Sequence, residues 1–301
     1  MNGVLVIDKP QGLSSHDVVN RVRRILGQRA VGHVGTLDPA ATGVLPLVVG
    51  SFTRLAQFYS HSTKCYEGII RFGFSTTTYD AEGERTSEPR AVDLTPDEIR
   101  ATGQKFVGCI EQMPPPFSAK KIAGVPAYKL ARKKKDVVLK PVPVEIKEFL
   151  ILDAAGDRAR FRATVGSGTY MRSVAHDLGQ MLGCGAHLAE LRRTAVAEFT
   201  IDQACTLEAL DTSMRQGSVV ELFVHPRKLI PQLPSVTATE QDVALIRYGR
   251  AVNLPEMSRS PQVKVFYGQR ELIAIATRIA GTLFHAGIVL LPSAPVPPRA
   301  A

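Results

Sequence analysis

One segment limits what this chain can fold into more than any other: residues 32–47, GHVGTLDPAATGVLPL. Its three glycines let the backbone turn tightly and pass close to a bulky group, and the apolar run at 44–50 predicts a buried strand. A single acid, Asp38, stands between small residues and before a proline. An Asp–Pro pair is typical of a tight turn, yet a carboxylate among small apolar groups is also a candidate nucleophile or base if a cation keeps it ionised. The spacing does not identify that cation.

The composition is typical of a globular protein, with 45% apolar and 22% charged residues, and 301 residues are enough for about two domains. No apolar run reaches the ~20 residues needed to span a bilayer. The first residues, MNGVLVIDKPQG, lack the basic segment and the cleavage site of a signal peptide. We therefore expect a cytoplasmic protein that does not associate with a membrane.

Motifs for a metal or a cofactor are not found. The four cysteines are scattered and form no C-x-x-C pair, which argues against a zinc site and against a disulfide framework. The GSGTY segment at 166–170 could bind phosphate at a helix N-terminus. It lacks the full P-loop and dinucleotide-binding patterns, and a tight turn between a strand and a helix is the favoured explanation. We expect chemistry from the chain's own side chains, without cofactor or metal.

The charge balance favours a polyanionic partner, with nucleic acid first. Lysine and arginine number 37 against 28 acids, a net charge of +9. Residues 118–140 hold eight basic residues and one acid around Tyr128, and such a stripe is suited to phosphates. The alternative is charge that serves solubility alone.

Apolar periodicity and capping residues predict the main elements. A helix is expected from Ser14 or Ser15 to about Leu26, and a capping box at Thr95 and Glu98 predicts another to about Phe106. Further elements are expected as strands at 3–7, 44–50 and 64–74, an antiparallel pair at 142–152 and 158–166, and helices after 170 and at the caps Thr206 and Thr239.

The composition changes at 229–240, where prolines and small polar residues gather. Short strand-like runs follow at 263–267 and 272–279, which predicts a small β-rich C-terminal domain. The proline-rich end at 293–301 is expected to be loose.

Five motifs in order resemble those of the TruB-type tRNA pseudouridine synthases. The glycine-punctuated segment GHVGTLDPAATGVLPLVVG resembles the family's signature loop, and the others are LVIDKPQGLSSHDVV (5–19), KCYEGIIRFGFSTTTYDAEG (64–83), PPPFSAKKIAGVPAYKLAR (114–132) and VGSGTYMRSVAHDLG with LAELRRTAVAEF (165–199). The likeness covers about the first 230 residues, and the C-terminal part resembles, more weakly, a PUA-like RNA-binding domain.

The resemblance implies an α+β pseudouridine-synthase-like fold, with a large, mostly antiparallel sheet and a central cleft, followed by a small PUA-like β-barrel. The implied division is a catalytic domain at 1–232, with an inserted basic thumb loop at about 114–140, and a PUA-like domain at 236–292.

The resemblance also assigns the catalytic residues. Asp38 matches the aspartate that attacks the target nucleotide, Tyr66 the tyrosine that packs on the base, and Arg172 the arginine that pairs with the aspartate. Whether attack falls on the uracil ring or on the ribose C1′ stays open. Residues matched to substrate binding are His33, as a wedge near the flipped base, Tyr170, Leu191, Asp80, Lys9 and, on the thumb, Lys120, Lys121 and Arg132. Phe117 stands where the family usually has tyrosine.

The implied reaction converts a uridine in the T-arm of tRNA, position 55 of the TΨC loop, to pseudouridine. Base detachment, rotation and rejoining through carbon require no cofactor, metal or energy source, but they require a base flipped from its stack. We expect tRNA as the partner and a monomer without an obligatory protein partner. Alternatives are a guide-RNA-dependent synthase, a tRNA-binding or tRNA-folding protein with an idle pocket, and a nucleotide-binding enzyme that uses GSGTY.

Overall fold

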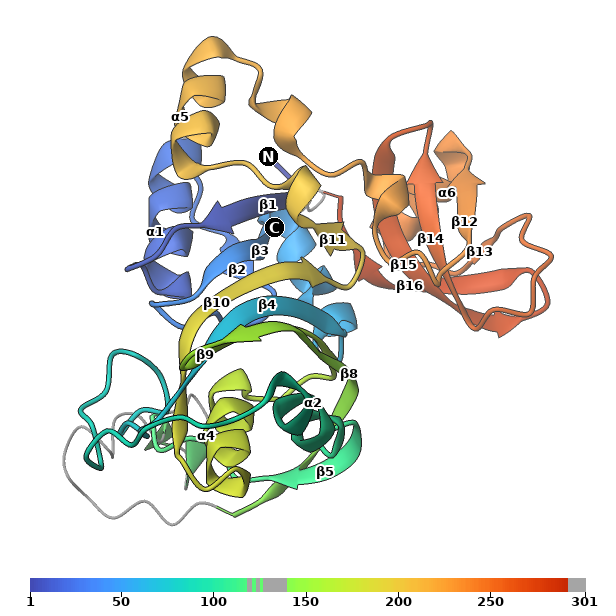
Figure 1. Cartoon of the computed structure of the whole chain (residues 1–301). Helices are drawn as coiled ribbons and strands as arrows, with labels where there is room; N and C mark the ends of the chain where they lie inside the picture. Colours follow the sequence, from blue (N-terminus) through green and yellow to red (C-terminus); the bar gives the residue numbers. More distant parts are fainter. Residues whose placement is uncertain (118–120, 123–124, 127–139, 292–301) are drawn as a thin grey trace.

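The structure is a computed structural model that describes residues 1–117, 121–122, 125–126 and 140–291. Its largest part is a curved sheet whose strands follow the order β1-β3-β10-β4-β9-β8-β5, with β2 paired to β3 and β11 to β10 (Figure 1). The strands are β1 (Gly3–Lys9), β2 (Val31–His33), β3 (Thr42–Val49), β4 (Lys64–Phe72), β5 (Gly108–Gln112), β8 (Val142–Ala155), β9 (Arg158–Val165), β10 (Ala186–Val196) and β11 (Phe199–Thr200). The strands β6 (Lys121–Ile122) and β7 (Val125–Pro126) pair separately.

Within the described part of this sheet the pairing is antiparallel except between β3 and β10. There Arg192 lies beside Thr42 and Arg193 beside Gly43. Gly43 has a φ of +101°, and a Cβ on it would lie 2.2 Å from the carbonyl oxygen of Arg193. Only glycine permits this close approach, which brings the segment before β3 against β10.

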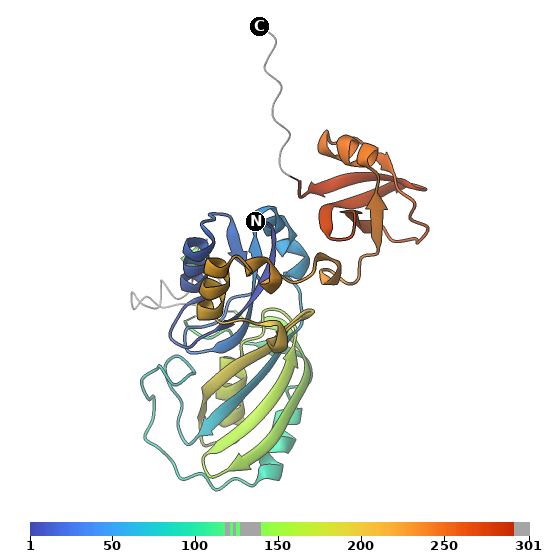
Figure 2. The ribbon, with the colours of Figure 1, turned by 90° about the horizontal axis from the view of Figure 1, so that it is seen from above.

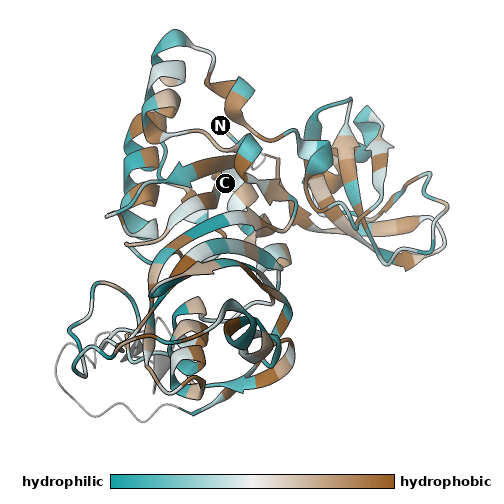
Figure 3. Cartoon of the chain, viewed as in Figure 1, coloured by the Kyte–Doolittle hydropathy of each residue, from teal (hydrophilic) through white to brown (hydrophobic). Residues whose placement is uncertain are grey.

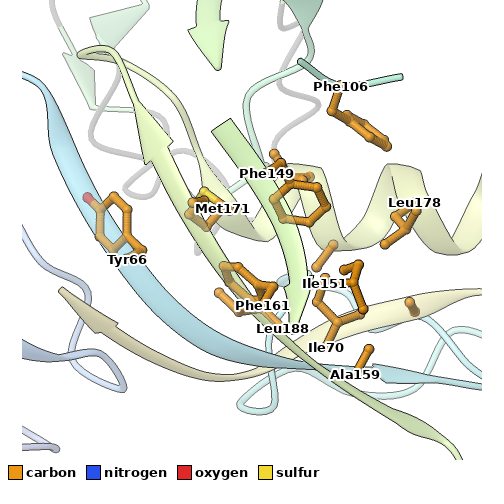
Figure 4. Packing of buried hydrophobic residues seen from close by; sticks show 14 of the residues in the cluster. Tyr66, Ile70, Phe106, Phe149, Ile151, Ala159, Phe161, Met171, Leu178 and Leu188 are labelled. Carbon is orange, nitrogen blue, oxygen red and sulfur yellow. The ribbon is translucent and has the colours of Figure 1, made fainter. Parts of the chain in front are cut away.

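Four helices cover the large sheet. The first, α1 (Ser15–Leu26), begins with a capping box between Ser14 and Asp17 and packs with α5 (Leu207–Gln216) against the β1–β3 end. The other two, α2 (Pro96–Gln104) and α4 (Met171–Met181), lie in the curve formed by β10, β4, β9, β8 and β5 (Figure 1). Between them and the sheet lies an apolar cluster that includes Phe149, Phe161 and Leu178, with Tyr66 at its edge (Figure 4).

A second, smaller sheet with the order β12-β14-β15-β16-β13 lies beside the first (Figure 2). Its strands are β12 (Ser235–Ala238), β13 (Val252–Asn253), β14 (Gln262–Tyr267), β15 (Glu271–Ala280) and β16 (Leu283–Val289), with the helix α6 (Glu240–Arg247). Phe266, Leu272 and Leu290 share an apolar cluster with Phe52 and Phe199 of the larger part, so the two parts pack through a common core.

Figure 3 shows the apolar residues on the strands of both sheets, whereas the loops are mainly hydrophilic. None of the helices among the described residues combines the length and apolarity needed to cross a membrane.

The predicted helices and strands are confirmed, with ends close to those expected from the caps. The prediction of an α+β architecture with a large, mostly antiparallel sheet and a second β-rich part is also confirmed. Other described elements were not predicted, among them the long strand β10, the shorter strands β2, β5, β11, β12, β13 and β16, and the 3₁₀ segment η1 (Gly50–Tyr59). Most of the predicted thumb loop and the tail at 293–301 lie outside the described residues.

Candidate active site

Asp38 lies in the loop between β2 and β3, and the loop is fastened on both sides of it. Leu37 exchanges two hydrogen bonds with Ser15, whose hydroxyl accepts from the Leu37 amide at 2.8 Å and donates to its carbonyl at 3.1 Å. The carbonyl of Pro39 accepts from Lys9 Nζ at 3.1 Å and from the Gly12 amide at 2.9 Å. The Ala41 amide donates to the Asp38 carbonyl, so the Asp–Pro segment is also a turn. These contacts hold the carboxylate in a fixed place.

The cation beside Asp38 is Arg172, in the first turn of α4. Its Nε lies 2.9 Å from Asp38 Oδ2, and its Nη1 lies 3.6 Å from Asp80 Oδ2. The guanidinium also donates to the carbonyls of Thr78 and Phe117, at 3.2 and 3.0 Å. A buried arginine held by four groups is rigid, and its ion pair orients the more exposed Asp38 carboxylate.

Tyr66 lies on β4 near Asp38 and is nearly buried. Figure 4 shows its hydroxyl directed away from the other labelled apolar side chains. Burial raises the pKa of Tyr66, whereas the positive charge of Arg193 and a hydrogen bond from it act in the opposite direction. The tyrosine therefore combines an apolar ring with a polarised hydroxyl.

Two hollows meet at Asp38. The first, of about 290 Å³, is lined by Asp38, Tyr66, Tyr170, Arg172 and Leu191, among others. The second, of about 650 Å³, contains Asp38 and Arg172 again, with His33, Asp80 and Phe117. The structure therefore brings six of the other predicted site residues to the two hollows that share the Asp38 carboxylate: His33, Tyr66, Asp80, Tyr170, Arg172 and Leu191.

The remaining predicted residues near the site have distinct surroundings. Burial lowers the pKa of His33, which favours a neutral ring on the wall of the second hollow. Asp80 is buried and accepts from the Thr78 hydroxyl and the Glu82 amide. Lys9 is buried and donates to three carbonyls, so it holds loops together, and it lines neither of the two hollows described.

The predicted thumb residues contribute no described contact to the site. Lys120 and Arg132 lie outside the described residues, and Lys121 is described only as part of the backbone of β6.

Three residues that sequence reasoning missed also shape the site. Gln112 forms two hydrogen bonds with the backbone of Tyr170 and so holds the start of α4. Lys64 lines the first hollow, and burial lowers its pKa to about 8. Arg193 is buried under the Asp38 loop. The arginine pair in LAELRRTAVAEF was the available signal for Arg193. Arginines among apolar residues indicate a side chain that is buried only if it has specific partners.

Residues 23–171 match the model of the TruB family pseudouridylate synthase N-terminal domain, and residues 172–227 match the tRNA pseudouridylate synthase B C-terminal domain. The chain belongs to the TruB family. It is therefore a pseudouridylate synthase, an enzyme of the isomerase class. The resemblance identified from the five motifs is confirmed.

Curated relatives extend this TruB match over nearly the whole chain. The chain is 50% identical over 293 residues to the tRNA pseudouridine synthase B of Solibacter usitatus, covering 96% of this chain and 100% of that protein. It is 37% identical over 283 residues to the enzyme of the same name from Bacillus cytotoxicus, covering 91% and 92%.

Solved structures support the pseudouridine synthase fold. A chain in a crystal structure of a Cbf5–Nop10–Gar1 complex superposes with a TM-score of 0.71 at 26% identity, covering 97% of this chain and 85% of that one. A chain of an H/ACA ribonucleoprotein bound to a substrate RNA containing 2′-deoxyuridine gives a TM-score of 0.71 at 25% identity, covering 97% and 86%.

Proposed function

We propose that this TruB family chain converts one uridine in the T-arm of tRNA, at position 55 of the TΨC loop, to pseudouridine, with Asp38 as the nucleophile. Asp38 forms a covalent bond to the target nucleotide, and the bond between uracil N1 and ribose C1′ breaks. The uracil rotates, its C5 forms a bond to C1′, loss of the C5 proton restores the C5–C6 double bond, and the freed N1 takes up a proton. Release of Asp38 completes an isomerisation that consumes no co-reactant.

The observation that supports this proposal is the place of the Asp38 carboxylate. It is paired with the buried Arg172, and it divides two hollows lined by Tyr66 on one side and His33 on the other. A nucleophile needs an ionised, oriented carboxylate, and a flipped base needs a recess with an apolar wall. Leu191 and Tyr66 supply that wall in the first hollow.

We propose tRNA as the macromolecular partner, because relatives at 50% and 37% identity are named tRNA pseudouridine synthase B. The similar solved chains come from a Cbf5–Nop10–Gar1 complex and from an H/ACA ribonucleoprotein bound to a substrate RNA, and their identity to this chain is only 25–26%. The higher identity supports a stand-alone tRNA enzyme over a guide-RNA-dependent one. The proposal thus includes a cytoplasmic monomer without an obligatory protein partner.

The decisive experiment incubates the purified protein with an unmodified tRNA transcript, without other RNA or protein, and maps pseudouridine by carbodiimide-stop sequencing. A single new stop in the T-arm is expected. A transcript with cytidine in place of the T-arm target uridine should show none. Absence of the stop at low salt would contradict the proposed function, and a stop that requires an added guide RNA would favour the alternative.

A further inference from the structure

Arg193 is a completely buried cation at the site, and the sequence analysis assigned no role to it. It lies on β10, opposite Tyr66 on β4, and its side chain is 0% exposed. No carboxylate among the described residues forms an ion pair with it. Its neighbour Arg192, by contrast, is partly exposed and pairs with Asp8 at 2.8 Å.

The partners of the Arg193 guanidinium are carbonyls of the segment that surrounds Asp38. Nε donates to Val44 at 2.8 Å, Nη1 to Thr36 at 3.2 Å and Nη2 to Gly35 at 3.0 Å. Burial of a cation without a counter-ion is costly, and an apolar side chain would fill the same space without that cost. The protein therefore needs the hydrogen-bond donors and the charge of the guanidinium at this position, and not merely a side chain that fills the space.

The guanidinium also interacts electrostatically with the hydroxyl of Tyr66, its neighbour across the two strands. A guanidinium has donors only, so the Tyr66 oxygen accepts from Arg193 and its own hydrogen points elsewhere. The same arginine thus fixes a catalytic hydroxyl on one strand and the loop of the nucleophile on another. Its charge also favours the ionised form of Tyr66 over the neutral one, against the effect of burial.

We propose that Arg193 is a positioning residue of this active site, which holds the Tyr66 hydroxyl in register with the Asp38 loop. The catalytic role that this inference gives to Tyr66 rests on the proposed function. In that reaction the C5 proton must leave after the carbon–carbon bond forms. The Tyr66 oxygen would relay this proton, accepting it as its own hydroxyl proton passes to solvent, while the C5–H electron pair restores the double bond and uracil N1 takes up a proton.

The first test measures ionisation at position 66 in the free protein, so it does not depend on the substrate. Trifluorotyrosine at position 66, whose hydroxyl is more acidic, is titrated by ¹⁹F NMR. Arg193→Met should move the midpoint to a higher pH by about one unit or more. Arg193→Lys keeps the charge but loses the planar guanidinium with its several donors, so it should move the midpoint less. Arg192→Met is the matched control and should leave it in place. An unchanged midpoint in Arg193→Met would overturn the inference.

The second test separates positioning from mere support of the fold, and it remains informative if Arg193→Met does not fold. In Arg193→Lys the single-turnover rate on tRNA should fall by about tenfold or more, while affinity for tRNA stays within about twofold. Loss of affinity and melting temperature in parallel with the rate, or an unchanged rate, would refute a positioning role. Failure of the proposed function would appear separately, as no turnover in the unsubstituted protein.

Discussion

Arg172 Nε lies 2.9 Å from Asp38 Oδ2, and the two partners differ in exposure: the arginine side chain is 7% exposed and the aspartate 42%. Arg172 is therefore the fixed, buried member of the pair, and Asp38 is the member that faces the hollows. Because Arg172 is also bound to Asp80 and to two carbonyls, it cannot follow Asp38 if the loop moves. The orientation of the carboxylate is thus set by α4 and not by solvent.

Asp38→Asn should abolish turnover and spare tRNA binding. An amide has nearly the shape of the carboxylate but is not a nucleophile, so a loss of about 10³-fold or more is expected. Pseudouridine mapping and a fluorescence binding assay measure the two effects. Asp202→Asn, at an exposed acid outside both hollows, is the control and should retain full activity. A modified product from Asp38→Asn would mean that the nucleophile is another residue.

Arg172→Met should destabilise the protein, because it leaves the buried Asp80 without its cation. Loss of one partner of a buried pair costs about 3 kcal/mol, which urea denaturation can measure. Arg160→Met breaks an exposed pair with Asp153 and should cost less than about 1 kcal/mol. Equal losses in the two variants would show that Asp80 does not depend on Arg172.

Arg172→Lys should keep a positive charge and still lose activity. An ammonium cannot span Asp38, Asp80 and two carbonyls at once. Misorientation of the nucleophile should lower the rate by about a hundredfold, measured in single turnover. A rate near that of the unsubstituted protein would imply that charge alone suffices.

Lys9 should give the stability a distinct pH dependence. Burial lowers the pKa of Lys9 to about 8 in the folded protein, from 10.5 for an ordinary lysine. Between these values the unfolded chain binds more protons at this site, so the free energy of unfolding rises with pH across the window. The free-energy cost of burying Lys9 in its charged form is fully present below about pH 8 and is lost as the pH approaches 10.5.

The Lys9 effect is measured by urea denaturation at two pH values. From about pH 7.5 to about pH 10, the gain in the free energy of unfolding should be about 2 kcal/mol larger in the unsubstituted protein than in Lys9→Met. Lys147→Met removes a partly exposed lysine and should behave like the unsubstituted protein. A gain of the same size in Lys9→Met would show that Lys9 is not the source of this pH dependence.

Ala197→Gly should stabilise the protein. Ala197 has a φ of +51° in the short turn between β10 and β11, a conformation that favours glycine. Relief of this strain is worth about 0.5–1 kcal/mol, visible in thermal unfolding. Ala244→Gly, at an exposed position within α6, should instead cost about 0.5–1 kcal/mol. Destabilisation by both changes would show that the Ala197 turn is not strained.

Local signals predicted much of the fold because their physics is local. Ser14, one of the two serines that the sequence offered, caps α1, and Thr95 and Glu98 cap α2 as predicted, since a cap depends on residues three positions apart. The strand β10 was missed because ELRRT has charged residues where a buried strand is expected to be apolar. Its burial depends on partners from β3 and β4.

By itself, the sequence determined the helix ends, the alternation of the paired strands and, through its ordered motifs, the family. It also predicted Asp38, Tyr66 and Arg172 as catalytic residues, and the structure places these three side by side. Only the tertiary structure decided that Arg172 is shared with Asp80 and that Arg193 lies buried beneath the loop of Asp38. The reason is physical: the state and role of a charge depend on which distant groups replace its water, and chain spacing does not encode those distances.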